Sequence, residues 1–262
     1  MLYRALTIAG SDSGGGAGIQ ADLKTFSAFG VYGMSVITSL TAQNTKGVYG
    51  IYDATGSFVY EQIKVVVEDI GVDAVKTGML SNEDIIINVA KAIRDFNIEK
   101  LVIDPVMVAK SGDLLLKPSA IEALIKELIP LSLIITPNIN EAKKICNIEI
   151  RNLHDMKECA KFISSLGAKC VIVKGGHMPL ENKVFDVVYY NNEFIELVYP
   201  YVDTKNTHGT GCTYSAAITA NLAKNRHIIK SIRIARSYVQ FAIENNLDLG
   251  GGHGPLGHFL TI

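Results

Sequence analysis

Short apolar runs alternate with amphipathic segments along most of this chain. The apolar runs predict buried strands, and the segments between them carry apolar residues at helical spacing. In the first such segment Ile19, Leu23 and Phe26 share one face, while Asp22 and Lys24 are predicted to face water. Repeated strand–helix units of this kind are typical of an α/β domain with a mostly parallel central sheet and helices on both faces.

The predicted elements follow one another without a linker or an internal repeat, so we expect a single domain spanning residues 1–262. Residues 185–201 alternate around Asn191-Asn192 and predict an antiparallel hairpin at the edge of the sheet. The predicted strands are 5–9, 36–42, 74–79, 101–106, 133–136 and 170–174, and the predicted helices are 19–29, 57–70, 82–96, 119–129, 139–146, 152–166, 213–223 and 228–245.

Composition excludes some classes of protein. Of the 262 residues, 48% are hydrophobic and 19% charged, and the formal net charge of -1 argues against a nucleic-acid partner. No apolar run approaches the ~20 residues that a membrane span needs. The four cysteines, Cys146, Cys159, Cys170 and Cys212, form no C-x-x-C pair. This favours reduced thiols in a cytoplasmic protein over a disulfide framework or a zinc site.

A glycine-rich segment, residues 10–18, joins the first predicted strand to the first predicted helix. A flexible turn is the plainer interpretation, but five glycines in nine residues carry an entropic cost that such a turn could avoid. Bare backbone before a helix offers free N–H groups to polar or anionic atoms. The spacing matches neither a P-loop nor a dinucleotide fingerprint. Because parallel sheets place ligands at the carboxyl ends of their strands, we expect a ligand loop here.

A second glycine-containing segment, Asn206-Thr-His-Gly-Thr-Gly-Cys-Thr213, precedes another predicted helix. Gly209 and Gly211 bracket Thr210, so several backbone N–H groups would point at one spot, which suits the charge on a phosphoryl group in transfer. Cys212 falls in the first helical turn, where the helix dipole is expected to lower the pKa of its thiol. A small buried cysteine that fills a gap between helix and sheet is the alternative.

Three more strand ends carry charged residues. Asp104 ends one strand and Glu141 follows another, so either carboxylate could hold Mg²⁺. For Glu141, a solvated charge in the first turn of a helix is an equal alternative. Lys174 stands beside Gly175-Gly176, where it could meet ATP phosphates or remain a surface lysine.

Amides and a polar loop complete the candidates. Gln43 ends a strand, and its amide could accept from an exocyclic amine and donate to a ring nitrogen, as an aminopyrimidine edge requires. The loop 109–113 could form a lid that excludes water. The histidines, among them His177 and His208, show no metal-ligand spacing and are interpreted as polar turn residues.

Taken together, these segments resemble the hydroxymethylpyrimidine/phosphomethylpyrimidine kinases, the thiamine-pathway branch of the ribokinase-like superfamily. The resemblance runs from about residue 5 to the tail at Gly254-Pro255, and the order of the motifs matches. Its motifs are residues 5–22, Thr-Ala-Gln-Asn-Thr at 41–45, Asp-Pro-Val-Met at 104–107, Ala-Lys-Ser-Gly-Asp at 109–113, and residues 206–213.

The resemblance implies a ribokinase-like three-layer sandwich, a homodimer, and ATP with Mg²⁺ as cofactors. It implies two successive phosphorylations of 4-amino-5-hydroxymethyl-2-methylpyrimidine, first to the monophosphate and then to the diphosphate. The implied roles are pyrimidine binding for Gln43, Gly10, Asp12, Met79 and Val106; nucleotide binding for Lys174, Asn138, Thr207 and Thr210; metal or phosphate binding for Glu141 and Asp104; an anion hole for Gly209 and Gly211; and the catalytic base for Cys212.

The sequence also departs from its relatives. Many members of the wider superfamily carry Asp where Cys212 stands, which leaves the identity of the base open. Some close relatives are pyridoxal kinases with an extra cysteine in the lid, where this chain has Ala109, and this favours the pyrimidine kinase. Pyridoxal kinase activity and a non-catalytic nucleotide-binding protein are the alternatives. The tail at 254–258 lacks the paired histidines of the family and is given no role.

Overall fold

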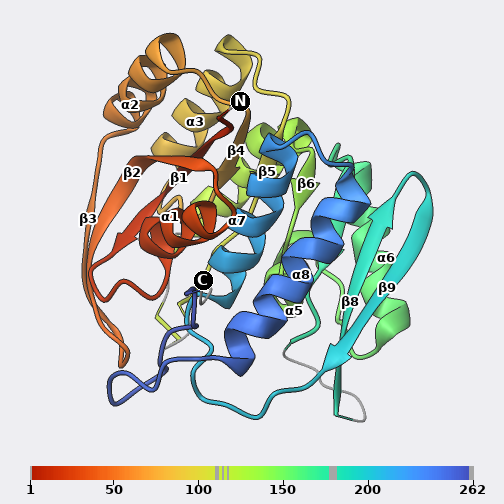
Figure 1. The fold of residues 1–262 in the computed structure, drawn as a ribbon. Coiled ribbons are helices and arrows are strands. Elements are labelled where there is room, and N and C mark those ends of the chain that lie inside the picture. The colour runs from red at the N-terminus through yellow and green to blue at the C-terminus, as the bar shows by residue number, and fades with distance from the viewer. Residues whose placement is uncertain (1, 110–111, 114, 117, 177–181, 260–262) are drawn as a thin grey trace.

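The central sheet has nine strands within the part of the chain that the structure, a computed structural model, describes: residues 2–109, 112–113, 115–116, 118–176 and 182–259. The strand order is β3-β2-β1-β4-β5-β6-β7-β8-β9 (Figure 1). The six strands from β2 to β7 in this order are parallel, whereas β3 and the β8–β9 hairpin extend the two edges in antiparallel pairing. The bounds are β1 (Arg4–Asp12), β2 (Tyr32–Gln43), β3 (Val48–Asp53), β4 (Ala74–Thr77), β5 (Leu101–Ile103), β6 (Ile134–Ile135), β7 (Cys170–Val173), β8 (Lys183–Tyr190) and β9 (Glu193–Pro200).

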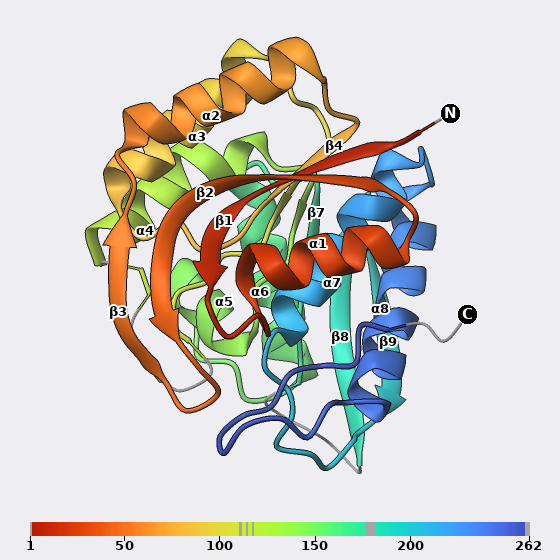
Figure 2. The same ribbon diagram turned by 60° about the vertical axis from the view of Figure 1, so that its left-hand side comes forward.

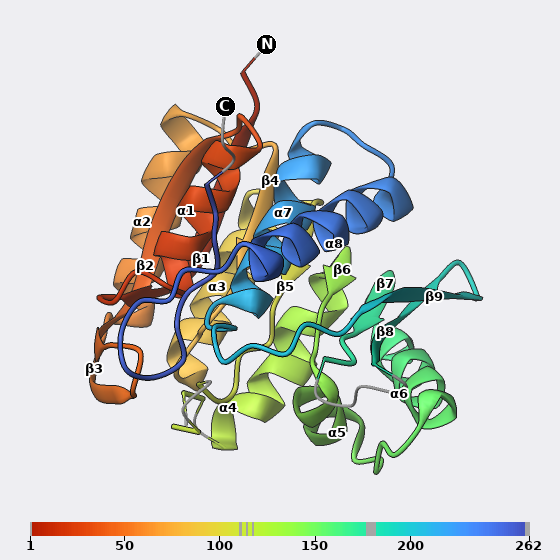
Figure 3. The ribbon, with the colours of Figure 1, turned by 60° about the horizontal axis from the view of Figure 1, so that its bottom comes forward.

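Helices cover both faces of the sheet, which confirms the predicted three-layer architecture. One face is covered by α1, α7 and α8, which lie side by side (Figure 3), and the other by α2 to α6. The bounds are α1 (Gly18–Ala28), α2 (Gly56–Asp69), α3 (Glu83–Asp95), α4 (Pro118–Ala123), α5 (Ile139–Cys146), α6 (Leu153–Ser165), α7 (Thr210–Ala223) and α8 (Ile228–Glu244), with a π turn η1 (Leu124–Leu128) and a 3-10 turn η2 (Ile129–Leu131) after α4.

Three local predictions need correction. Strand β3 is not predicted, because Tyr49, Ile51 and Tyr52 place exposed apolar groups on both faces of an edge strand and no alternation results. The predicted helix 119–129 leaves regular α-helical geometry after Ala123, since Pro130 supplies no N–H for a helical bond. The predicted turn at 10–18 is shorter, because β1 continues to Asp12.

Helix α7 forms the centre of its layer. It packs on β1, β4 and β5 and between α1 and α8, and all of its residues from Thr213 onward are buried. The small side chains of Ala216, Ala217 and Ala220 let it approach the sheet closely. Asp22 of α1 was predicted to face water, but its side chain is fully buried in this layer.

The expectation that all four cysteines are reduced is wrong for one pair. Cys146, at the end of α5, and Cys159, in α6, form a disulfide with their Cα atoms 5.9 Å apart. Sequence spacing gives no sign of the pair, because it depends on how the two helices pack. Cys170 and Cys212 are free.

The β2–β3 hairpin and the C-terminal tail lie beside the carboxyl ends of the parallel strands. Strands β2 and β3 form a long curved hairpin (Figure 2), and the C-terminal tail bonds to its turn through the N–H of His253 and the carbonyl oxygen of Thr45, 2.8 Å apart. The tail also holds the segment before α7, because Gly254 accepts the N–H of His208 at 3.1 Å. No helix among the described residues has the length and apolar character needed to cross a membrane.

Candidate active site

All the residues predicted for the site line one cavity of about 690 Å³ at the carboxyl ends of the parallel strands. Segments far apart in the sequence contribute to it, from the end of β1 to the last turn of α8 and His253 of the C-terminal tail. The structure therefore brings the candidates together, while their individual roles stay predictions. They are Gly10, Asp12, Gln43, Met79, Asp104, Val106, Asn138, Glu141, Lys174, Thr207, Gly209, Thr210, Gly211 and Cys212.

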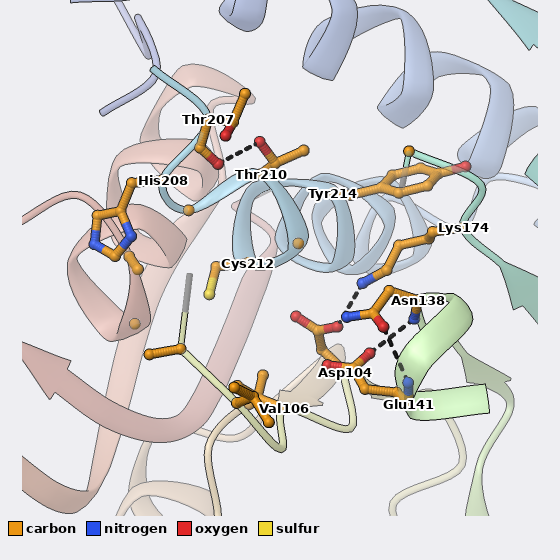
Figure 4. Close-up of a pocket in the computed structure, with 18 of the residues that line it drawn as sticks. Asp104, Val106, Asn138, Glu141, Lys174, Thr207, His208, Thr210, Cys212 and Tyr214 are labelled. Atoms are coloured by element: carbon orange, nitrogen blue, oxygen red, sulfur yellow. Dashed lines mark hydrogen bonds and ion pairs between the residues drawn. The ribbon is translucent and has the colours of Figure 1, made fainter. Parts of the chain in front are cut away.

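Helix α7 points its N-terminus into this cavity (Figure 4). Gly209 is the residue before the helix and has a φ of 83°, and a side chain there would collide with the carbonyl oxygen of Gly16. The Thr210 hydroxyl donates to the Thr207 carbonyl oxygen at 2.8 Å and fixes the preceding turn. The Thr210 N–H donates to the Thr207 carbonyl oxygen at 3.3 Å, whereas the N–H groups of Gly211 and Cys212, which have no partner in the first turn of a helix, are available to an anion.

An ion pair lies against this N-terminus. Lys174, directly after β7, places its Nζ 2.8 Å from Oδ1 of Asp104, directly after β5. A β-carbon added to Gly211 would lie 3.2 Å from Lys174 Nζ and 3.3 Å from Asp104 Oδ2. That Oδ2 is buried without a hydrogen-bond partner among the described residues, which is costly unless a ligand satisfies it. The corner between α7, Lys174 and Asp104 is thus built to receive a polar group.

Glu141 closes the same corner from the first turn of α5 (Figure 4). Its Oε2 accepts the Asn138 N–H at 2.7 Å, and its own N–H donates to Asn138 Oδ1 at 3.0 Å, which makes a reciprocal cap. Burial raises the pKa of Glu141 to about 7, while Lys174 lowers it and Asp104 raises it. A carboxyl group that is half protonated near neutral pH, beside a second carboxylate, fits a divalent cation that would displace the proton.

The expectation of a lowered pKa for Cys212 is wrong. Burial raises the pKa of its thiol to about 12, although Lys76 and the N–H of Gly18 lower it. The helix dipole that the sequence analysis invoked is therefore outweighed by the loss of water around the sulfur. Cys212 is a neutral thiol at pH 7 in the free protein.

Asp12 organises the opposite end of the cavity. Its carboxylate accepts the N–H groups of Gly14, Gly16 and Ala17 at 2.8, 3.0 and 2.8 Å and lies 2.8 Å from Nε2 of His208. Burial raises the pKa of Asp12, but the hydrogen bonds from His208 and from the backbone N–H groups together lower it by more. The pKa of Asp12 is therefore below its ordinary value. The N–H groups of the turn are bound by Asp12 and are not free for a ligand as predicted.

His208 is more than the polar turn residue of the sequence interpretation, because its buried ring lines the cavity. Gln43 Nε2 lies 3.5 Å from His208 Nε2, and Gln43 Oε1 accepts the Thr41 hydroxyl at 3.1 Å. These polar groups face an apolar wall that includes Met79 and Val106. A few polar groups against an apolar wall suit a small aromatic heterocycle. The spacing of the histidines gave no sign of this position in the cavity.

No sequence motif marks the far end of the cavity, where α7 and α8 face β8. Arg236 Nε lies 2.9 Å from Asp186 Oδ2, and both side chains are buried. The hydroxyl of Tyr214 is buried and has no hydrogen-bond partner in the described ranges. All three line the cavity, yet they stand within regular elements where no motif marks them. The unpartnered Tyr214 hydroxyl is therefore available to a ligand larger than the heterocycle.

The predicted lid, residues 109–113, falls partly outside the described residues, which omit 110–111. The Ala109 N–H donates to the Asp113 carbonyl oxygen at 2.8 Å. Asp113 Oδ2 accepts the Val48 N–H at 3.0 Å, so this loop is tied to β3 beside the cavity. Its closure over a ligand stays a prediction.

Comparison with known proteins places this cavity in a family context. The family model for phosphomethylpyrimidine kinase matches residues 12–257. Hydroxymethylpyrimidine/phosphomethylpyrimidine kinase of Bacillus subtilis is 48% identical over 258 residues, which cover 98% of this chain and 95% of that protein. The structure of phosphomethylpyrimidine kinase from Clostridium difficile is 49% identical, with a TM-score of 0.81 over 92% of this chain and 99% of that chain.

Pyridoxal kinases share the backbone. The ADP complex of Bacillus subtilis pyridoxal kinase gives a TM-score of 0.91 at 40% identity and covers 98% of both chains. It therefore superposes on this chain better than the Clostridium difficile enzyme does, at lower sequence identity. Backbone similarity alone does not separate the two substrate classes, so the distinction has to come from side chains in the cavity.

Proposed function

The chain belongs to the phosphomethylpyrimidine kinase family, and we propose that it phosphorylates 4-amino-5-hydroxymethyl-2-methylpyrimidine with ATP, and then its monophosphate, for thiamine biosynthesis. The observation that carries the proposal is one cavity with a heterocycle-binding end at Gln43 and His208 and an anion-binding end at the start of α7. Because residues from Gly10 to Gln240 line it, the whole chain acts as one catalytic domain in this proposal.

The pyrimidine is held at the Gln43 end. The substrate edge offers an amine that donates and a ring nitrogen that accepts, and the Gln43 amide has the complementary pair of groups. With the ring against Met79 and Val106, the hydroxymethyl group points toward Cys212. Cys212 orients the hydroxyl as the thiol, and only after losing its own proton can it take up the hydroxyl proton as the thiolate during transfer.

The γ-phosphoryl group lies over the first N–H groups of α7, beside Lys174, and the rest of the nucleotide extends toward Tyr214 and Arg236. Phosphoryl transfer depends mainly on positioning and on neutralisation of charge. The backbone N–H groups and the Lys174 ammonium supply both. The helix N-terminus is therefore the principal catalytic device, and Cys212 is secondary.

Asp104 and Glu141 fit the Mg²⁺ that accompanies ATP. Mg²⁺ binds through one or two carboxylates together with substrate phosphates and water, and here two carboxyl groups share a buried corner. When bound, the ion would neutralise phosphate charge and orient the phosphates. Asp104 and Glu141 would hold the Mg²⁺ ion next to the N-terminus of α7.

Replacing Glu141 with glutamine is expected to raise the Mg²⁺ concentration needed for half-maximal activity by about tenfold, because one anionic ligand is lost. In the wild type, turnover at limiting Mg²⁺ should rise with pH through about 7, as Glu141 ionises. The folded-state pKa of Glu141 is above its unfolded value, so ionisation of Glu141 at higher pH lowers the free energy of unfolding. The Glu141→Gln variant should lose both the rise of turnover with pH and this loss of stability. Steady-state rates over a Mg²⁺ and pH series measure the first effect.

Asp155→Asn is the matched control, since Asp155 also lies in the first turn of a helix, α6, and accepts a backbone N–H, from Arg151 at 2.8 Å. It should leave the Mg²⁺ dependence unchanged. A Glu141→Gln enzyme with wild-type Mg²⁺ dependence would remove Glu141 from the metal site.

The proposed reaction is tested by incubating the protein with ATP, Mg²⁺ and the pyrimidine, with ADP release and product masses followed over time. We expect the monophosphate to appear first and the diphosphate to follow. If neither the pyrimidine nor its monophosphate supports ADP release, the assignment is refuted.

Pyridoxal is the second candidate acceptor, because a pyridoxal kinase shares this backbone with a TM-score of 0.91. Ala109 argues against it, since the resemblance places a cysteine at this lid position in the pyridoxal kinases. The cavity wall formed by Met79, Val106 and Gln43 also suits the smaller aminopyrimidine.

A homodimer is proposed to form through the β2–β3 hairpin, with a second copy of the chain as the partner. Tyr49 and Tyr52 are 70% and 76% exposed, and Leu40, paired with Tyr52 across the strands, is half exposed. Strand β3 lies at the edge of the sheet, so among the described residues no further strand pairs with its outer side, beside these apolar side chains. The same patch on a second copy would cover both.

Tyr52→Asp combined with Ile51→Asp is therefore expected to convert a dimer into a monomer, measured by light scattering after gel filtration. Burying two carboxylates in an apolar interface is unfavourable. Phe162→Asp, on exposed α6 at the other side of the molecule, is the control and should not change the mass. A wild-type monomer, or a dimer that survives the double change, would contradict this interface.

A further inference from the structure

The C-terminal tail, residues 246–258, has no role in the proposed mechanism, yet it bonds to the turn that leads into α7. The side chain of Asn206 is buried and bridges two parts of the tail: its Oδ1 accepts the Gly254 N–H at 3.1 Å, and its Nδ2 donates to Asn246 Oδ1 at 2.7 Å. The carbonyl oxygen of Gly254 accepts the N–H of His208 at 3.1 Å. Because His208 stands one residue before the N-cap of α7, these bonds fix the backbone directly before the helix.

The tail contacts α7 a second time, one turn inside the helix. Nε2 of His258 lies 2.8 Å from Oγ1 of Thr213, and both side chains are buried. The backbone N–H of Thr213 donates to the Gly209 carbonyl oxygen at 2.9 Å, so this residue also closes the first turn of the helix. His258 is itself held in place, because its carbonyl oxygen accepts the Tyr238 hydroxyl of α8 at 3.1 Å. The tail is therefore attached to α7 both before and after its first residues.

The two attachments enclose the N–H groups that are proposed to hold the γ-phosphoryl group. Gly211 and Cys212 lie in the chain between them. Elsewhere the tail is bonded to the β2–β3 hairpin, through the His253 N–H and the Thr45 carbonyl oxygen at 2.8 Å. Groups that act on a transition state depend on their position, and a misplacement of about 1 Å can cost about 10²-fold in rate. A segment that fixes this turn to a neighbouring hairpin can therefore affect catalysis from outside the cavity.

We propose that the C-terminal tail holds the start of α7 in the position that phosphoryl transfer requires, with Asn206 and His258 as positioning residues. Neither side chain is among the described residues that line the cavity, so both act through the backbone of α7 and the turn before it. The inference rests on the proposed function, because it takes the start of α7 as the place where the γ-phosphoryl group is held.

Gly254→Ala tests the first attachment, because a β-carbon at Gly254 would collide with Asn206 Oδ1 and lie 2.9 Å from the Leu247 carbonyl oxygen. The tail and the turn must then separate. In the substrate-free protein, hydrogen exchange of the peptide 205–214, measured by mass spectrometry, should be about tenfold faster than in wild type. With saturating ATP and pyrimidine, kcat should fall by about tenfold or more. The Kd for ADP, which carries no γ-phosphoryl group, should stay near the wild-type value.

Gly251→Ala is the matched control in the same tail. Among the described residues, a β-carbon there would meet only the end of the flexible Lys46 side chain, 3.0 Å from its Cε. Hydrogen exchange and kcat should both equal those of wild type. A folded Gly254→Ala variant with wild-type exchange or wild-type kcat overturns the proposal. An equal loss of kcat in Gly251→Ala also overturns it.

Thr213→Val tests the second attachment without adding a clash, and it decides the question if Gly254→Ala does not fold. Loss of the hydroxyl that bonds His258 should lower kcat by about threefold, the size of one hydrogen bond. Thr213→Ser keeps the hydroxyl and should retain wild-type kcat. Wild-type kcat in Thr213→Val overturns the proposal. If the wild type transfers no phosphate to the pyrimidine, the proposed function fails, while hydrogen exchange still shows whether the tail fixes the start of α7.

Discussion

Replacing Gly211 with alanine should lower kcat by about 10²-fold or more and leave the protein folded. Gly211 is in the first turn of α7, and the added methyl would sit 3.2 Å from Lys174 Nζ and 3.3 Å from Asp104 Oδ2. It would therefore occupy the corner proposed for the γ-phosphoryl group. Loss of a single preorganised donor at a charged transition state costs about 10²- to 10³-fold. Steady-state rates with saturating ATP and pyrimidine measure the effect.

Stability and activity should separate in this variant. The backbone of Gly211 has no positive φ, so alanine fits the helix, and its gain in helix propensity of at most about 1 kcal/mol is offset by the close contacts with Lys174 and Asp104. Gly176→Ala is the matched control: Gly176 also lines the cavity, but a β-carbon there meets no atom of the described residues within 4 Å. Its kcat should stay near wild type. Full activity in Gly211→Ala would place phosphoryl transfer away from the start of α7.

The second large effect is expected for Cys212→Ala, which should lower kcat by about 10- to 100-fold while the KM for ATP changes little. A positioned group that handles a proton contributes about 10²-fold or more in general. Here its share should be at the low end, because phosphoryl transfer relies chiefly on charge neutralisation and positioning. The raised pKa of the Cys212 thiol points the same way.

Cys170→Ala controls for the loss of a buried thiol, since Cys170 lies in β7, is fully buried, and does not line the cavity. It should lower the unfolding midpoint while kcat stays unchanged. Undiminished turnover in Cys212→Ala would remove Cys212 from the reaction.

The parallel core of the fold was readable from sequence because strands such as 101–106 are short apolar runs between amphipathic helices. Elements that depend on tertiary context were not. Strand β3 is exposed on both faces and lacks alternation, and the Cys146–Cys159 disulfide depends on how α5 and α6 pack. Asp22 has helical spacing typical of a solvated residue, yet it is buried because Lys76 on a different strand neutralises it.

The site shows the same division. Gly211, Gln43 and Glu141 stand at strand or helix ends, where parallel topology gathers ligands, and they were predicted. Tyr214 and Arg236 lie inside helices, where nothing local marks them, and they were missed. The prediction of a lowered pKa for Cys212 was wrong for a related reason. The sequence shows that Cys212 lies at the start of a helix, but the burial that raises its pKa depends on the packing of other elements.

The central claim is that this cavity selects the aminopyrimidine. The most direct test compares kcat/KM of the wild-type protein for 4-amino-5-hydroxymethyl-2-methylpyrimidine and for pyridoxal, under the same ATP and Mg²⁺ concentrations. A pocket that pairs Gln43 with the substrate edge should discriminate by about tenfold or more, because an analogue without matching groups leaves buried polar atoms unpaired. We predict that kcat/KM for the pyrimidine is higher by at least that factor. An equal value, or a higher value for pyridoxal, would contradict the assignment.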